Sequence, residues 1–262
     1  MKYFGGCDVG STYTKTVILD ENGAIVAANT IKSKINSAQS AKAGLDQAIA
    51  DAGLKEISDL TYLIGTGYGR NKVPQADENI SEISCHAMGV HVTDPSVRAI
   101  IDIGGQDAKV LSLNEEGRMV NFVMNDKCAA GTGRFLDVMA NILKLDISQL
   151  ETEAAKAVKP ASISSTCTVF AESEVISQLA SGTDIPDLVA GICQSVATRV
   201  ASLAKRVGVR EEVCMSGGVA QNGGVRNAMA KELGVEIYYD KRAQELGALG
   251  AAIYAYGKSS QE

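Results

Sequence analysis

Apolar residues near the N-terminus form three short runs, at positions 3–8, 14–20 and 24–31, which are separated by polar turns. The first turn contains Gly10 and Ser11, and the second contains Gly23. Short apolar runs between turn residues are typical of β-strands joined by tight hairpins. The pattern predicts a three-stranded antiparallel meander at the start of the chain.

The same pattern returns further along, with predicted strands at 99–102, 109–113 and 118–123. The two copies align at constant spacing: Asp8-Val9-Gly10-Ser11 with Asp102-Ile103-Gly104-Gly105, Lys15 with Lys109, and Gly23 with Gly117. A repeated strand-turn-strand unit is the mark of an internal duplication. We therefore expect each copy to open one lobe of a two-lobed protein.

Helical periodicity follows each meander. The first helix is predicted at 38–52, and the second carries an apolar stripe at i, i+3, i+4, i+7 and i+8, formed by Phe135, Val138, Met139, Ile142 and Leu143. The chain is thus predicted to be an α/β protein of two duplicated lobes around a nucleotide cleft. Residues 1–95 plus 245–262 form the first lobe, which includes the final helix, and residues 96–244 form the second.

The turns of the two meanders have the chemistry of phosphate-binding loops. In each, a carboxylate, Asp8 or Asp102, ends the first strand and small residues form the bend. Backbone N–H groups in such a bend approach an oxyanion, and the carboxylate binds Mg²⁺ or its waters. A single Asp-x-Gly turn has a plain β-turn as the commoner explanation. Two copies at matched spacing favour phosphate binding.

A third glycine-rich turn follows the predicted strand 213–215. There, Ser216-Gly217-Gly218 leads into a helix, and glycines without side chains allow a flat purine to lie against the backbone. Alone, this segment would be read as a tight strand-to-helix turn. Gln244, before the final helix, is either a nucleotide contact or a surface residue.

Composition narrows the class of protein. The chain has 262 residues, 45% of them hydrophobic, and a net charge of −6. An acidic chain is a poor match for nucleic acid, whose binding depends on Lys and Arg at phosphates. No run approaches the ~20 apolar residues of a membrane span. We therefore expect a cytoplasmic protein that binds neither nucleic acid nor membrane.

Six cysteines are scattered along the chain without a C-x-x-C pair, which argues against disulfides or a zinc site. Cys7, Cys193 and Cys214 lie in apolar runs and are expected in the core. Cys128 and Cys167 each stand at the apparent start of a helix, where free N–H groups and the helix dipole favour a thiolate. Thiolates are the ligands of iron–sulfur clusters.

These motifs together resemble a known family. The Asp8, Asp102 and Gly217-Gly218 segments resemble the phosphate-1, phosphate-2 and adenosine motifs of the actin, Hsp70 and sugar kinase superfamily, whose lobes are ribonuclease H-like. The segments around Cys128 and Cys167 resemble the ATPase activators of 2-hydroxyacyl-CoA dehydratases, relatives of the benzoyl-CoA reductase ATPase subunits. The likeness extends over essentially the whole chain.

The resemblance implies a homodimer with one 4Fe-4S cluster between the subunits, to which Cys128 and Cys167 of each copy contribute. It further implies an ATP-driven carrier that is reduced by ferredoxin or flavodoxin. Such a carrier passes one electron to a separate 2-hydroxyacyl-CoA dehydratase and so starts a radical dehydration.

Under this interpretation, we assign Mg²⁺ and attacking-water roles to Asp8, Asp102 and Asp107, and leave open which of them positions the water. The predicted contacts to ATP or ADP are Ser11, Thr12, Tyr13, Thr14, Lys15, Gly104, Gly105, Gln106, Gly217, Gly218 and Gln244.

Three alternatives remain from the sequence. One is an ATPase subunit of a benzoyl-CoA reductase, which differs chiefly in its partner. Another is a small-molecule kinase that uses Asp126 as a base, and the third is a non-catalytic actin-like ATPase. The sequence leaves open the acyl group of the substrate, the role of the loop 65–70, and the role of Cys85-His86, for which a packed helix is preferred.

Overall fold

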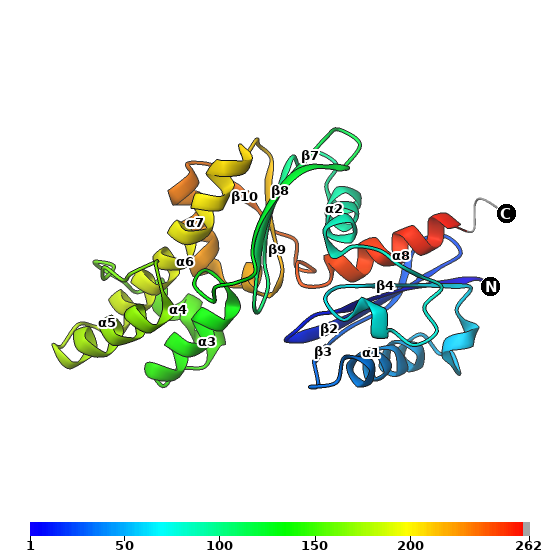
Figure 1. Ribbon diagram of the computed structural model, residues 1–262, viewed down its shortest axis with the longest axis horizontal. Coiled ribbons are helices and arrows are strands. Elements are labelled where there is room, and N and C mark those ends of the chain that lie inside the picture. The colour runs from blue at the N-terminus through cyan, green and yellow to red at the C-terminus, as the bar shows by residue number, and fades with distance from the viewer. Residues whose placement is uncertain (259–262) are drawn as a thin grey trace. The chain divides into compact units, whose positions relative to one another are not determined.

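The computed structural model describes residues 1–258 and divides the chain into two compact units (Figure 1). The first unit contains Met1–Val97, Leu113–Met119 and the C-terminal part from Asp240. The second contains Arg98–Ser112 and Val120–Tyr239. The predicted first lobe, 1–95 plus 245–262, includes residues 259–262, which lie outside the described part.

A five-stranded sheet forms the centre of the first unit. Its strands, in the order β3-β2-β1-β4-β5, are β3 (Ile25–Lys32), β2 (Tyr13–Asp20), β1 (Tyr3–Val9), β4 (Tyr62–Thr66) and β5 (Glu78–Asn79). The first three strands are antiparallel, while β4 is parallel to β1 and β5 is parallel to β4. The predicted meander is therefore confirmed.

The second unit repeats this sheet. Its order is β10-β9-β6-β7-β8, with β10 (Ile237–Tyr238), β9 (Val213–Ser216), β6 (Ala99–Ile103), β7 (Ala108–Leu113) and β8 (Met119–Asn125). β6 is antiparallel to β7 and parallel to β9, as β1 is to β2 and β4. Both the duplication and the α/β class are thus confirmed.

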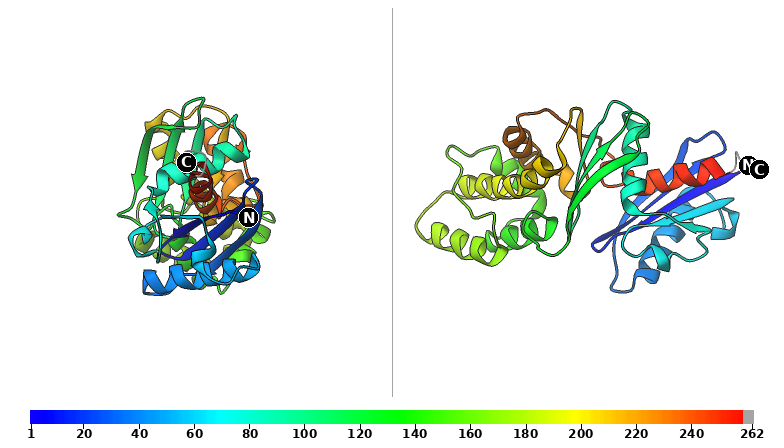
Figure 2. Two further views of the ribbon diagram at one scale, coloured as in Figure 1. Left: turned by 90° about the vertical axis from the view of Figure 1, so that its right-hand side faces the viewer. Right: turned by 45° about the horizontal axis from the view of Figure 1, so that its top comes forward.

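Three main helices complete the first unit: α1 (Ser37–Asp51), α2 (Glu82–Thr93) and α8 (Leu246–Lys258), with short 3-10 helices η1 (Ile57–Asp59) and η2 (Arg70–Lys72). Asn36 caps α1 by accepting the N–H groups of Ala38 and Gln39. The buried face of α1, with Leu45 and Ala48, packs against the sheet. Helix α8 packs along β1 and β4 (Figure 2).

Glycine allows α8 to lie close to its neighbours. A Cβ on Gly6 of β1 would collide with the Ala248 carbonyl, and one on Gly89 of α2 would collide with the Leu246 carbonyl. The turn at Gly117, between β7 and β8, packs on the ring of His91 in α2. This contact explains why residues 113–119 group with the first unit.

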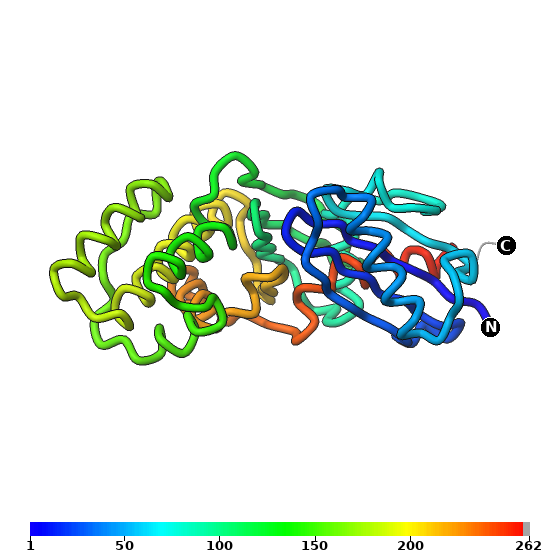
Figure 3. Tube along the Cα trace, turned by 90° about the horizontal axis from the view of Figure 1, so that it is seen from below, coloured from blue at the N-terminus to red at the C-terminus, as the bar shows by residue number. Residues whose placement is uncertain are grey.

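The second unit is richer in helices. Its helices are α3 (Gly133–Ile142), η3 (Ile147–Gln149), α4 (Leu150–Ala154), α5 (Thr168–Ala180), α6 (Ile185–Val207), η4 (Gly218–Gln221) and α7 (Gly223–Leu233). Helix α6 has Pro186 in its first turn and ends at Gly208, a left-handed cap. It is the buried centre of this group and packs against α4, α5 and α7 (Figures 1 and 3).

Across residues 1–258, no helix has the length and apolar character that a bilayer span requires.

Candidate functional site

The first hairpin places a lysine directly opposite the carboxylate that ends β1. Asp8 and Lys15 are paired residues of the β1–β2 ladder, and Lys15 Nζ lies 2.8 Å from Asp8 Oδ2. Their side chains are 5% and 14% exposed, so the pair is largely desolvated. One carboxylate and one ammonium leave this site electrically balanced.

The second hairpin repeats the pair and adds a carboxylate. Asp102 and Lys109 are paired residues of the β6–β7 ladder, 3.3 Å apart, and Lys109 Nζ also lies 2.6 Å from Asp107 Oδ2. Ser216 Oγ of β9 donates to Asp102 Oδ1 at 3.0 Å. Two carboxylates around one ammonium carry a net negative charge, which suits a divalent cation with oxygen ligands.

The two bends are closed by matching backbone bonds. Gly10 N–H donates to the Tyr13 carbonyl at 3.1 Å, and Gly104 N–H donates to the Asp107 carbonyl at 2.9 Å. Ser11 in the first bend and Gln106 in the second are exposed, so both bends are open to a ligand. The predicted phosphate contacts at these bends therefore lie on accessible turns.

The remaining predicted residues of the first loop differ in exposure. Thr12 is half-buried and Tyr13 is exposed. Thr14 is buried, and its hydroxyl shares a 2.9 Å hydrogen bond with Ser33. A direct phosphate contact by Thr14 would require its hydroxyl to exchange that partner.

Two glycines with positive φ lie against the two strand-end carboxylates. Gly67 follows β4 with φ +85°, and Gly217 follows β9 with φ +82°. A Cβ on Gly217 would lie 2.7 Å from Asp102 Oδ1, and a Cβ on Gly67 would collide with Asp8 Oδ1. The backbone at both places passes next to the carboxylate because no side chain intervenes.

This correspondence shows that the loop 65–70 lies beside Asp8. The sequence alone left the role of this loop open. Thr66 is opposite Asp8 in the β1–β4 ladder, just as Ser216 is opposite Asp102 in the β6–β9 ladder. The loop is therefore the counterpart, in the first unit, of the glycine-rich turn after β9. The signal available in the sequence was the Thr-Gly and Ser-Gly step at the end of each strand.

The glycine-rich turn also leads directly into a helix. Gly218 is exposed at the start of η4, and Asn222 caps α7 by accepting the Val225 N–H at 3.0 Å. Arg226, which sequence reasoning missed, donates to the Ala220 carbonyl and lies 4.0 Å from the Tyr239 ring centroid. Gln244, in the first unit, is half-buried just before α8.

Cys128 does not begin a helix, contrary to the prediction. It lies in a loop between β8 and α3, and α3 starts only at Gly133. The Asn125 side-chain amide stabilises this loop by donating to the carbonyls of Cys128, at 2.9 Å, and Ala130, at 3.2 Å. The thiol is half-buried.

The start of α3 is fixed by the second hairpin. The N–H groups of Gly133 and Arg134 donate to the carbonyls of Gly104 and Gly105, at 2.9 and 2.8 Å. Two of the free N–H groups of the first turn are thus satisfied by the bend of the second hairpin. The helix that directly follows the loop of Cys128 is therefore joined to that bend by two hydrogen bonds.

Cys167 does begin a helix, as predicted. It is the N-cap residue of α5, with extended backbone at φ −149°, and its thiol is half-buried. Glu174 of α5 binds the segment before Cys167: its Oε2 accepts the N–H of Ser164 at 2.6 Å. Glu172, on the same helix, does not bind the backbone of this segment, so the two glutamates are not equivalent.

The other four cysteines are sealed in the core, as expected for Cys7, Cys193 and Cys214. Burial raises the pKa of Cys7, Cys85 and Cys193 to about 12, so these thiols stay protonated at neutral pH. Cys85 and its neighbour His86 are both buried in α2, in line with a packed helix.

The donor set fits half of an iron–sulfur site. Cys128 and Cys167 are the half-exposed thiols of the chain, and both belong to the second unit. Within residues 1–258, no three His, Cys, Asp or Glu side chains gather closely enough to hold a metal. A cluster with four thiolate ligands would therefore need two more from a second copy of the chain.

Comparison with known proteins gives consistent matches over the full length. Residues 6–255 match the BadF/BadG/BcrA/BcrD ATPase family. The chain is 53% identical to the (R)-2-hydroxyglutaryl-CoA dehydratase activating ATPase of Acidaminococcus fermentans, over 99% of both chains. It is 48% identical to the activator of lactoyl-CoA dehydratase of Anaerotignum propionicum, over 97% of both.

A solved structure gives the same picture. The activator of the 2-hydroxyisocaproyl-CoA dehydratase from Clostridium difficile, with bound ADPNP, superposes with a TM-score of 0.95. Its sequence is 51% identical, and the match covers 99% of this chain and 96% of that one. The named acyl groups differ among these three relatives, although their identities to this chain are similar.

Proposed function

This chain belongs to the BadF/BadG/BcrA/BcrD ATPase family, and we propose that it is the ATP-dependent activator of a 2-hydroxyacyl-CoA dehydratase. In this role it donates single electrons to the dehydratase from a 4Fe-4S cluster held between two copies. Ferredoxin or flavodoxin is the proposed electron source. Because similar relatives name different acyl groups, the proposal extends to the 2-hydroxyacyl-CoA class and not to one substrate.

The observation that carries the proposal is the connection between a phosphate loop and a thiol loop. The bend at Gly104 and Gly105 accepts two hydrogen bonds from the start of α3, directly after the loop of Cys128. A change of ligand at the bend would displace the end of that loop. Such a connection would let the ligand at the bend alter the surroundings of Cys128, as an ATP-driven electron donor requires.

The nucleotide chemistry is assigned to the two hairpins. Asp102 and Asp107 would hold Mg²⁺, because their site carries excess negative charge beside Lys109. Backbone N–H groups and the hydroxyls of Ser11 and Thr12 would bind phosphate oxygens. The attacking water would be oriented by a carboxylate that accepts its hydrogen bond, as in other phosphoryl transfers.

Cys128 and Cys167 would hold the cluster, which supplies one-electron transfer when bound. The protein contributes the rest. Asn125 fixes the backbone beside Cys128. The first N–H groups of α5 point towards its N-terminal end, where Cys167 is the N-cap. Hydrogen bonds and exposure around such thiolates set the reduction potential of an iron–sulfur site.

The test is anaerobic purification of the wild type and of Cys128→Ser, Cys167→Ser and Cys193→Ala. We expect a brown wild-type dimer with about four irons per dimer, no retained iron in either serine variant, and normal iron in the buried Cys193→Ala control. ATPase activity should survive all three changes because the hairpins are intact. A colourless wild type that phosphorylates a small molecule would overturn the proposal.

The partner is tested separately. The reduced wild type should transfer electrons to a 2-hydroxyacyl-CoA dehydratase only when ATP is present, followed as loss of the reduced-iron signal. Transfer at equal rate with ADP would contradict the ATP-dependent role.

A further inference from the structure

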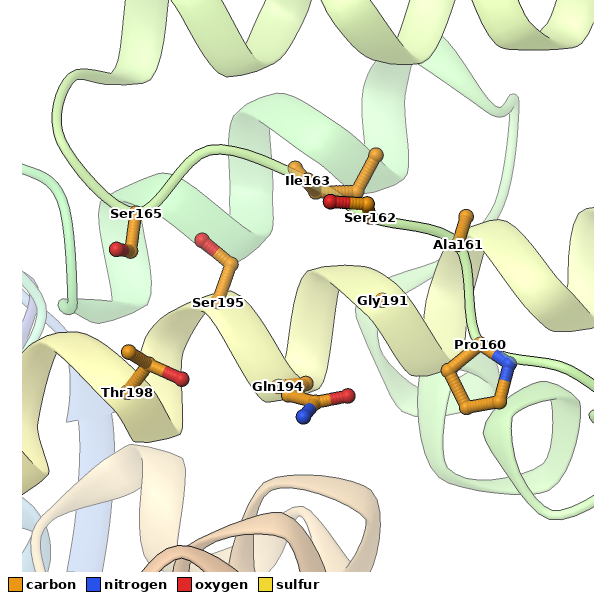
Figure 4. Close-up of a pocket in the computed structure, with 9 residues that line it drawn as sticks. All are labelled: Pro160, Ala161, Ser162, Ile163, Ser165, Gly191, Gln194, Ser195 and Thr198. Atoms are coloured by element: carbon orange, nitrogen blue, oxygen red, sulfur yellow. The ribbon is translucent and has the colours of Figure 1, made fainter.

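The segment 160–166, which leads into Cys167, runs between α5 and α6 without forming a helix or strand (Figure 4). Extended segments of this kind need side-chain partners for their backbone groups. The partners come from both helices. We call residues 160–166 the Cys167 strap.

Helix α5 holds the strap through two side chains. Glu174 Oε2 accepts the Ser164 N–H at 2.6 Å, and Gln178 Nε2 donates to the Ser162 carbonyl at 2.8 Å. The first bond joins a carboxylate to a backbone N–H, and such charge-assisted bonds are about twice as strong as neutral ones. It fixes the strap three residues before Cys167.

Helix α6 holds the opposite side of the strap. Ser195 Oγ donates to the Ser164 carbonyl at 2.9 Å, and the Ala161 N–H donates to the Asp187 carbonyl at 2.9 Å. A Cβ on Gly191 would collide with the Ala161 carbonyl, so glycine is needed for this close approach. The peptide groups on both sides of Ser164 Cα are thus bound by different helices.

A polar cavity of about 330 Å³ lies between these contacts. Hydroxyl and amide groups line it, from Ser162, Ser165, Gln194, Ser195 and Thr198 (Figure 4). The strap is therefore attached to α6 at particular residues rather than packed against it along its length. Movement of α6 would reach the strap through those residues.

Helix α6 is in turn packed on the helix that follows the glycine-rich turn. Thr198 Oγ1 lies 3.4 Å from Glu232 Oε2 of α7, and Cys193 Sγ lies against Gly224. Asn222, the residue after η4, is the N-cap of α7, which begins at Gly223. A continuous set of contacts within the second unit therefore runs from the glycine-rich turn through α7 and α6 to the strap.

We propose that Glu174 and Ser195 are positioning residues that hold the Cys167 strap between α5 and α6 and thereby set the geometry of the Cys167 thiolate. The proposal rests on the proposed function, under which Cys167 is a cluster ligand, but the hydrogen bonds of the strap can be tested without it. Glu174 fixes the strap in place, and Ser195 transmits the position of α6. Neither side chain is a ligand in this role.

The direct test is hydrogen exchange of the segment 160–167 in the full-length, anaerobically purified protein. Glu174→Ala should speed exchange at Ser164 about tenfold, since loss of one charge-assisted hydrogen bond shifts a local opening equilibrium by at least that factor. Glu174→Gln keeps an acceptor without its charge and should fall between wild type and Glu174→Ala. Glu172→Ala, on the same helix with the same charge change, is the matched control.

A second variant keeps the proposal testable if Glu174→Ala fails to fold. Ser195→Ala removes one hydroxyl and should also speed exchange in 160–167. The difference in exchange of this segment between ADP and a non-hydrolysable ATP analogue should then disappear, while nucleotide protection of residues 223–233 remains. Unchanged exchange in both Glu174→Ala and Ser195→Ala would overturn the proposal.

A spectroscopic readout separates this inference from the proposed function. In iron-loaded protein, Glu174→Ala should shift the midpoint potential and the electron paramagnetic resonance spectrum, while Glu172→Ala should change neither. If the wild type holds no iron, the proposed function fails, yet the exchange experiment still decides whether the strap is held. If iron is present and neither spectrum nor potential moves, the positioning role is refuted.

Discussion

The two units share a sheet but differ in the segment that comes after its third strand. In the first unit, β3 leads through Asn36 into α1, which covers the sheet. In the second, β8 leads into the loop of Cys128, and a helical group that includes the Cys167 strap separates that loop from β9. The repeated part thus contains the hairpins proposed to bind phosphate, and the unrepeated part contains Cys128 and Cys167.

The paired hairpins differ in charge in a way that suggests a division of labour. Asp8 and Lys15 balance each other, while Lys109 is shared by Asp102 and Asp107. A balanced pair adds no net negative charge that would repel phosphate from its bend. An excess carboxylate attracts the metal that accompanies the phosphate.

Carboxylate variants test this division most strongly. Asp102→Asn should lower ATP hydrolysis about 10²- to 10³-fold, the range seen when one electrostatic group of a reaction centre is lost. Asp107→Asn should raise the Mg²⁺ concentration needed for half-maximal rate, and Asp8→Asn should affect the rate more than the Mg²⁺ requirement. Steady-state ATPase assays across Mg²⁺ concentrations measure both, with exposed Asp46→Asn as control.

If Asp8→Asn and Asp107→Asn shift the Mg²⁺ requirement equally, the two hairpins do not divide phosphate binding and Mg²⁺ binding between them.

The lysines should differ in their contribution to folding. Lys109→Met leaves two carboxylates without their buried ammonium and should cost about 3–5 kcal/mol in the free energy of unfolding. Lys15→Met leaves only one, at a more exposed pair, and should cost about 1–2 kcal/mol. Urea unfolding gives both values. A larger loss of stability for Lys15→Met than for Lys109→Met would contradict the interpretation that the second hairpin carries the excess negative charge.

The two glycines beside the carboxylates should respond differently to alanine. Both Gly67→Ala and Gly217→Ala force a left-handed residue, which costs about 1–2 kcal/mol, and add a crowded Cβ. Gly217→Ala should raise the KM for ATP, whereas Gly67→Ala should mainly lower kcat by displacing Asp8. Gly53 and Gly182 also have positive φ, but a Cβ added at either would meet no atom within 4 Å. Gly53→Ala and Gly182→Ala therefore measure the backbone effect alone.

An unchanged KM for ATP in Gly217→Ala would remove the glycine-rich turn from the nucleotide site.

Raising the pH should leave the stability of the fold unchanged near neutrality and lower it at alkaline pH. This is the smallest of the expected effects. Burial raises the folded-state pKa of Cys7, Cys85 and Cys193 from 9.0 to about 12. A raised pKa means that this stability is complete below pH 9 and falls as pH rises towards 12. Cys7 and Cys85 lie in the first unit and Cys193 lies in the second, so hydrogen exchange from about pH 9 upward should show protection falling around each of these thiols.

Unchanged protection around these thiols up to about pH 11 would show that they do not govern alkaline unfolding.

Sequence reasoning located the hairpins because their chemistry is local. Asp8 and Lys15 lie on adjoining strands of one hairpin, and the repeat at Asp102 and Lys109 confirmed the pattern. Cys167 was found as a helix start because serine and threonine precede it. In these cases short-range spacing determines the contact.

Other features depended on contacts between distant segments. Ala129-Ala130-Gly131 is compatible with a helix, but α3 begins later because Gly133 and Arg134 bind the carbonyls of Gly104 and Gly105. The bond from Ser164 to Glu174, and the match between the loops at Gly67 and Gly217, likewise arise from tertiary packing. Propensity alone contains no information about such partners.

The position of α8 has a consequence for synthesis. This helix packs on β1 through Gly6, yet it is made from the last described residues of the chain. The strands of the first unit leave the ribosome before α8, so their α8-facing side stays uncovered until α8 has emerged. All of the second unit, up to Tyr239, emerges before that moment. The first unit is therefore completed after the second, although its strands are made earlier.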